Sequence, residues 1–234
     1  MASTIDYLLQ DSGAMLLAVS TNRPKLTEKG FTEEAYTALV GAHDELKATE
    51  LAQQKAVKFA EDKTAEQNET VDRITDLLRS VRNAAKSAYE EDARSLALFK
   101  IGEKIPGSVK KLRTTCEYMF SIVDERKADL LKSGLVQADV DALSTASDDL
   151  AAADAAQEGA KKTQAVATLT RDAAAKQLKT KLTKLRNFVK AAFAKNPEIA
   201  LQFNPIPKGH GGKGKPGDDE EETPPPDEPT PSAQ

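Results

Sequence analysis

The side chains that most often do chemistry in proteins are few in this chain and lack the partners that such chemistry needs. Histidine occurs only as His43 and His210. A zinc site on a helix needs a second histidine about one turn away, and neither histidine has one. Carboxylate pairs such as Asp148 with Asp149 occur, but di-metal carboxylate bundles combine them with Glu-x-x-His motifs, which this sequence does not contain. We therefore predict no catalytic, cofactor-binding or metal-binding residues and no cofactor.

The single cysteine, Cys116, excludes an internal disulfide and a multi-cysteine metal site. A reactive thiol needs a neighbouring base or cation that favours the thiolate. The sequence offers no credible catalytic partner, so we interpret Cys116 as a packed core or boundary residue.

Basic residues are densest in one stretch near the end of the body, which contains Lys176, Lys179, Lys181, Lys184, Arg186 and Lys190. On a helix they scatter around every side that the neighbouring leucines and Val189 do not occupy. We interpret the stretch as solvated surface that complements the negative end of a helix dipole. The alternative is that it docks the acidic C-terminal segment or another anionic partner.

Composition favours helices. Hydrophobic residues make up 39% of the 234 residues, aromatic residues only 5%, and tryptophan is absent. The core must therefore use Leu, Val, Ile and Ala, whereas strands favour aromatic and β-branched side chains. Residues 204–234 hold three lysines and seven acidic residues, which accounts for the whole net charge of −4 and leaves the body neutral. A neutral body lacks the basic face of nucleic-acid-binding proteins, so we expect no nucleic-acid partner.

The N-terminal segment has no basic region and is interrupted by Asp6 and Asp11, which argues against a signal peptide. No apolar run approaches the ~20 residues of a membrane span. We expect a cytoplasmic protein without a membrane span.

The sequence aligns with itself, without gaps, at an offset of 104 residues. The matches include Gly30 with Gly134, Leu78 with Leu182, Arg82-Asn83 with Arg186-Asn187, and Phe99 with Phe203. We interpret residues 1–104 and 105–206 as two copies of one helical unit that pack as one bundle. The repeated Arg-Asn pair predicts a structural hydrogen bond to a neighbouring loop in each copy; a symmetric partner-binding feature is the alternative.

Each unit reads as a short helix followed by a long one. Apolar residues mark a first helix over residues 3–19, and Pro24 ends it. Thr32 is a candidate N-cap for the long helix, and no Gly or Pro occurs between residues 42 and 101. A turn within the polar residues 61–70 is possible, but the apolar spacing continues through them, so we favour one continuous helix. Each short helix would then cover half of its own long helix, and the other half would pair antiparallel with the second copy.

This order of elements, with the closing segment Ala194-Lys195-Asn196-Pro197-Glu198, resembles the tandem alanine-rich helical modules of uncharacterised bacterial proteins. The resemblance covers Met1 to about Pro207 and implies a helical fold, but no activity. We predict an all-α, elongated antiparallel bundle of two tandem short-helix-plus-long-helix units.

Residues 207–234 change in composition to a Gly/Lys linker, the acidic run Asp218–Glu222 and Pro224-Pro225-Pro226. Such a segment cannot bury apolar surface, so we predict a disordered tail that solubilises the chain or docks as a peptide.

The functional expectation is a non-enzymatic structural or protein-interaction bundle, with a protein partner or self-association and no small-molecule substrate. The alternative is a membrane-acting helical protein of the pore-forming type.

Overall fold

The structure is a computed structural model that describes residues 4–207, and within this range every regular element is a helix. The helices are α1 (Thr4–Thr21), α2 (Arg23–Glu28), α3 (Glu33–Ala88), α4 (Ala93–Leu98), α5 (Val109–Glu125), α6 (Lys127–Lys132), α7 (Gln137–Ala192) and α8 (Pro197–Leu201). The all-α prediction is confirmed. The predictions for His210, the acidic run and the rest of residues 208–234 lie outside the described residues.

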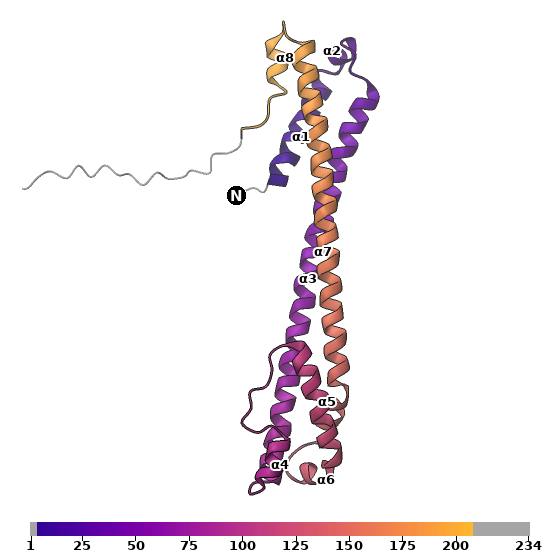
Figure 1. Cartoon of the computed structure of the whole chain (residues 1–234). Helices are drawn as coiled ribbons and strands as arrows, with labels where there is room; N and C mark the ends of the chain where they lie inside the picture. The colour runs from indigo at the N-terminus through magenta and orange to yellow at the C-terminus, as the bar shows by residue number, and fades with distance from the viewer. Residues whose placement is uncertain (1–3, 208–234) are drawn as a thin grey trace, which may run out of the picture.

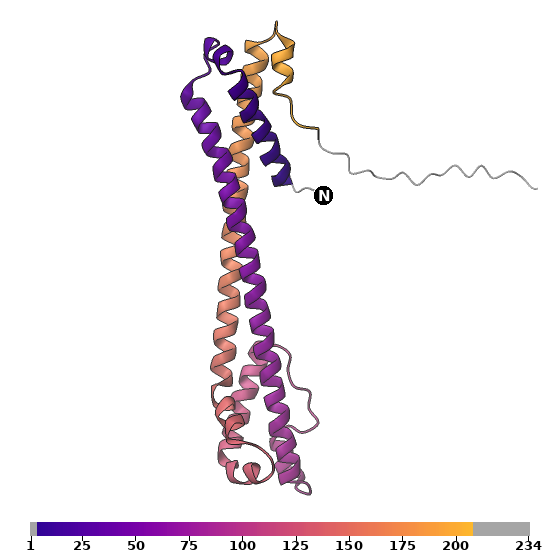
Figure 2. The ribbon, with the colours of Figure 1, turned by 180° about the vertical axis from the view of Figure 1, so that it is seen from behind.

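Two long helices, α3 and α7, lie side by side and antiparallel along the whole rod, and the short helices lie at its two ends (Figures 1 and 2). Each has 56 residues, which is about 84 Å of helix at 1.5 Å per residue. The prediction that the long helix is continuous is confirmed. The alternative prediction of a turn within residues 61–70 is wrong, because these residues lie inside α3. The N-cap prediction is also confirmed, since the Thr32 hydroxyl accepts a hydrogen bond from the Ala35 N–H.

The helix bounds repeat at the interval that aligns the sequence. Both bounds of α3 and of α2 recur 104 residues later in α7 and α6. The turn before each long helix contains a glycine with positive φ, Gly30 at 92° and Gly134 at 100°. Residues with a Cβ adopt this conformation only at a cost, which explains why glycine stands at both places.

The core is divided into two apolar clusters, one at each end of the rod. At the end that carries α2, here called the α2 end, α1 packs on the first half of α3 and the last half of α7. At the end that carries α6, the α6 end, α5 packs on the first half of α7 and the last half of α3. Each cluster therefore combines residues from both halves of the sequence, as the arrangement expected from continuous helices requires.

Between the clusters only α3 and α7 form the rod, and this middle part is here called the waist. Its buried positions are small or polar: Ala56, Ala60 and Ala160 with Gln67 and Gln157. Gln67 donates a hydrogen bond to Asp154 (Nε2 to Oδ1, 2.8 Å), and Gln157 donates to Thr64 (Nε2 to Oγ1, 3.4 Å). These hydrogen bonds favour one register of the two helices, because sliding either helix by one turn would leave the buried amides without partners.

Ile74, Leu78 and Val81 of α3 are buried in a cluster to which α5, α6 and α7 contribute. We expect an isolated fragment of residues 1–104 to dimerise through this stripe or to fray over residues 70–88, because its own unit leaves the stripe uncovered. Sedimentation of the fragment, with amide exchange of the same residues in the intact chain as the control, distinguishes these states. A monomeric fragment protected over residues 70–88 would contradict the shared core.

Candidate functional site

The residues that sequence reasoning weighed for catalysis have structural roles. His43 is half-buried, and its Nδ1 lies 2.7 Å from the Oγ of Ser12. Such a pair could suggest a nucleophile and its base, but Ser12 is fully buried and its hydroxyl donates to the Leu9 carbonyl (3.0 Å). Because Ser12 has one hydroxyl proton, Nδ1 of His43 must donate in this arrangement, and His43 holds α1 on α3. No group of three His, Cys, Asp or Glu side chains that could hold a metal ion occurs in residues 4–207.

Cys116 is buried in the core cluster of the α6 end, which confirms its interpretation as a packed residue. Burial, together with a smaller effect of the nearby Glu117 carboxylate, raises the pKa of its thiol to about 11. The thiol is therefore neutral and shielded at physiological pH.

The repeated arginines fulfil the predicted structural role. Arg186 donates from Nε to the Phe203 carbonyl (3.1 Å). Arg82 donates from Nη1 to the Glu103 carbonyl (2.7 Å). Arg82 thus holds the segment that follows α4, and Arg186 holds the segment that follows α8. The prediction of a repeated hydrogen bond to a neighbouring loop is confirmed.

Arg186 has a second partner that the sequence did not indicate. Its Nη2 lies 2.7 Å from both carboxylate oxygens of Asp11, which is almost completely buried. The backbone N–H of Ile206 also donates to Asp11 (3.2 Å), and the Tyr7 hydroxyl donates to the Ile206 carbonyl (2.6 Å). These bonds tie α1, α7 and the segment after α8 together at the α2 end.

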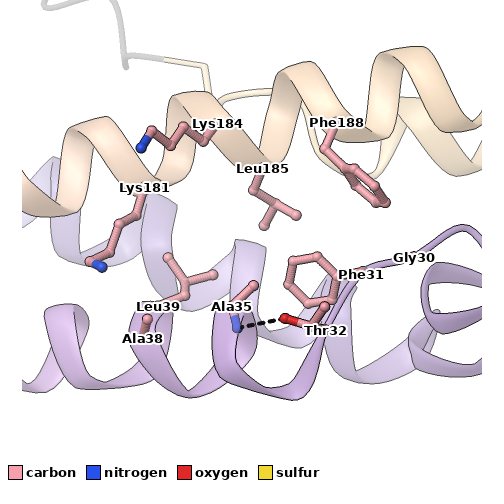
Figure 3. Close-up of a pocket in the computed structure, with 10 residues that line it drawn as sticks. All are labelled: Gly30, Phe31, Thr32, Ala35, Ala38, Leu39, Lys181, Lys184, Leu185 and Phe188. Carbon is pink, nitrogen blue, oxygen red and sulfur yellow. Dashed lines mark hydrogen bonds between the residues drawn. The ribbon is translucent and has the colours of Figure 1, made fainter.

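An apolar hollow with a volume of about 340 Å³ lies at this end, between α3 and α7 (Figure 3). We call it the α3–α7 groove, and its lining is Gly30, Phe31, Thr32, Ala35, Ala38, Leu39, Lys181, Lys184, Leu185 and Phe188. The rings of Phe31 and Phe188 are 5.8 Å apart and tilted by 43°, and they lie at one end of the groove. Lys181 and Lys184 reach from α7 at the other end.

Comparison with positions 104 residues away explains why the groove is open at this end. Phe31 corresponds to Leu135, and Phe188 corresponds to the smaller Ala84. Both Leu135 and Ala84 are buried. The bulkier rings need more space between the helices, and the start of α3 splays away from α7 at the α2 end (Figures 1 and 2).

A side-chain bond also closes the corresponding place at the α6 end. There, Ser80 on α3 donates to Asp139 on α7, with 2.9 Å between the oxygens. The corresponding residues at the α2 end are Lys184 and Ala35, and alanine cannot form such a bond. The groove therefore results from both larger aromatic residues and a missing cross-link.

The charges around the groove are unequal. On the α3 side the acidic residues are engaged: Glu33 pairs with Arg23, and hydrogen bonds from its own backbone N–H and from Thr32 lower the pKa of Glu34. On the α7 side, Lys181 and Lys184 form no ion pair with any residue of 4–207. The site thus combines an apolar floor with two uncompensated cations.

No protein-family model, curated protein or solved structure matches the chain. No helix of residues 4–207 is both long enough and apolar enough to cross a membrane. The site must therefore be understood from its own geometry.

We expect Cys116 to react with a thiol reagent at pH 8 at least about a hundredfold more slowly in the folded protein than in denaturant, because burial blocks access and suppresses the thiolate. The measurement is the rate of colour release from a disulfide reagent, with and without guanidinium. Equal rates in the two conditions would contradict the buried position.

Asp11→Asn is expected to lower the free energy of unfolding by about 3 kcal/mol, because it leaves the Arg186 guanidinium poorly compensated in a buried place. Asp149→Asn is the matched control, since it removes a half-exposed aspartate that lies 2.8 Å from Arg73. That variant should cost less than about 1 kcal/mol. Urea melts of the two variants test this difference, and equal losses would show that the Asp11 pair is no more important than a surface pair.

Proposed function

We propose that the chain consists of two copies of one helical unit and acts as a non-enzymatic interaction rod. In this proposal the α3–α7 groove binds an amphipathic helix of a protein partner that carries apolar residues and nearby acidic residues. The observation that carries the proposal is the groove itself, an apolar hollow beside two unpaired lysines. The helix bounds that recur after 104 residues support the duplication.

The shape of the groove favours a helix as the occupant. The groove runs between two helices, and α1 already packs against the same pair from another side. α1 meets α7 through Arg186, which lies about 200° around the helix from Lys184, so the two sites do not overlap. An additional helix could place apolar side chains over Ala38 and Leu39 by ridge-and-groove packing.

The charges favour acidic residues beside the apolar face of that helix. Lys181 and Lys184 are three residues apart on α7, so their side chains project on neighbouring turns of one face. Carboxylates one turn apart on the partner would meet both cations. A lysine or arginine at the same place would be repelled, which would give selectivity as well as affinity.

The test is a photo-reactive residue introduced at Ala38, in the groove, in cells that contain the native partners. The matched control carries it at Ala52, two heptads further along the same face of α3 and outside the groove. We expect an adduct at position 38 but not at 52, and the cross-linked segment should be a helix with apolar and acidic residues. The adduct should disappear in Lys181→Glu/Lys184→Glu, a variant expected to remain folded because Lys184 is exposed and Lys181 half-exposed.

Adducts of the same kind at positions 38 and 52 would contradict specific binding in the groove. An adduct that survives the double charge reversal, or that maps to a basic segment, would contradict the proposed chemistry of the partner.

A further inference from the structure

The α6 end contains a second hollow, of about 440 Å³, between α3 and the loop that follows α4. We call it the Arg82 hollow, and its lining is Thr75, Arg79, Arg82, Asn83, Lys86, Ile101, Gly102, Glu103, Lys104 and Ile105. Four of these residues are basic and one is acidic. The lining of the hollow is therefore mostly positively charged, whereas the helical part of the chain, residues 1–203, has no net charge.

Arg82 lacks the carboxylate that its counterpart has. Arg186 stands 104 residues after Arg82 and is paired with the buried Asp11. The residue 104 positions after Asp11 is Thr115, which is also buried and whose hydroxyl donates to the Lys111 carbonyl (2.9 Å). Thr115 brings no charge, and Arg82 forms no ion pair within residues 4–207.

The surroundings leave the Arg82 guanidinium incompletely satisfied. Its Nε is buried and has no hydrogen-bond partner among the described residues, and only Nη1 is bonded, to the Glu103 carbonyl. Burial lowers the pKa of Arg82 while the nearby Glu103 carboxylate opposes this effect. A guanidinium remains charged at neutral pH, so the charge persists without the compensation that a buried ion normally has.

The segment that lines the Arg82 hollow corresponds in sequence to the segment that Arg186 holds. At the α2 end, the N–H of Ile206 also binds the Asp11 carboxylate. The residue 104 positions before Ile206 is Gly102, which lines the Arg82 hollow. A carboxylate in the hollow would have the Arg82 guanidinium as its charged partner, and the peptide N–H groups of this lining segment are candidate further donors.

We propose that the Arg82 hollow binds carboxylates, and that its occupant is the acidic run Asp218–Glu222 of a second copy of the chain. This run carries five consecutive carboxylates. Lys86 and Lys104 add positive charge around Arg82, whereas the charge of Arg79 is partly compensated by its ion pair with Asp76. The complementary charges thus lie on one chain. The proposal does not depend on the α3–α7 groove, which lies at the other end.

Chain length excludes docking within one molecule. Ile206 is fixed beside Asp11 and Arg186 at the α2 end. Along the rod, Arg82 lies close to Asp139 of α7, because Ser80, two residues before Arg82 on α3, donates a hydrogen bond to Asp139. From residue 139 to residue 186 the α7 helix rises about 70 Å. The 16 residues from Ile206 to Glu222 span at most about 55 Å even when fully extended. The acidic run can therefore reach the hollow only of another molecule.

The test uses the full chain and a labelled peptide of residues 216–226, with fluorescence anisotropy as the measurement. Arg82→Gln should weaken binding of the peptide at least about tenfold, since it removes a charge-assisted pair. Lys161→Gln is the matched control, because it removes one charge from the exposed surface of α7, outside both hollows, and should leave the affinity unchanged. A peptide in which the five acidic residues are replaced by Asn and Gln should not bind.

Two variants test the comparison between the ends directly. Thr115→Asp would supply the missing carboxylate from the protein itself, and we expect a higher melting temperature and loss of peptide binding. Arg73→Gln, which removes an exposed arginine elsewhere on α3, should retain binding and serves as the control for charge loss on that helix. Peptide binding that is equal in wild type and Arg82→Gln, or that is lost in Lys161→Gln as well, would overturn the carboxylate site.

Sedimentation velocity of the full chain at rising concentration tests the identity of the occupant. We expect association that weakens with added salt and that Arg82→Gln abolishes. A chain that binds the peptide through Arg82 but remains monomeric at concentrations well above the dissociation constant of the peptide would overturn the second copy as the occupant.

Discussion

The rod depends on one constraint, which is that each long helix carries an apolar stripe twice as long as its own short helix can cover. α1 shields the first half of α3, and the stripe from Ile74 to Val81 continues beyond its reach. Water is excluded from this second half only when α7 and α5 pack on it, and the same holds in reverse for the end of α7. Antiparallel pairing of the two long helices is the arrangement that satisfies both halves at once. The order of the short helices and the division of the core into two clusters follow from that pairing.

The waist has the opposite character. Its buried residues are mostly alanines and glutamines, which contribute little apolar area. What they provide is close approach and a defined register. Gln67 donates a hydrogen bond to Asp154. The residues at the corresponding positions, 104 residues away, are Arg171 and Glu50, and their side chains lie 3.8 Å apart. These two polar links flank the centre of the rod and hold the clusters at a fixed separation, so that the stability resides at the ends while the middle determines the length.

Much of the fold was predictable because its signals are local. The 3-4 spacing of apolar residues, the absence of Gly and Pro between residues 42 and 101, and the cap at Thr32 together indicate a continuous α3. The site was not predictable, because it depends on contacts between distant residues. Asp11 and Arg186 are 175 residues apart, and an aspartate within an apolar stripe gives no indication of its partner. The burial of Ser12 was not predictable either, because a small polar residue on α1 is compatible with both a buried and an exposed position. The groove left a fainter signal: two of the seven phenylalanines, Phe31 and Phe188, stand where the other half of the sequence has Leu135 and Ala84.

The differences between the two halves are therefore more informative about function than their similarities. Residues that match across the interval of 104 maintain the helices, the turns and the clusters. Residues that differ create the features that only one end has: the open groove with Lys181 and Lys184 at the α2 end, and the uncompensated Arg82 at the α6 end. Two copies that lie antiparallel would place the α2 end of each beside the α6 end of the other. In such a pair the acidic run of each copy could reach the Arg82 hollow of the other, so the proposed contact would form twice and close as a two-fold dimer. End-to-end contacts would instead leave one end free for a further copy, and because the rod is straight and its waist is fixed in register, such contacts would form open chains.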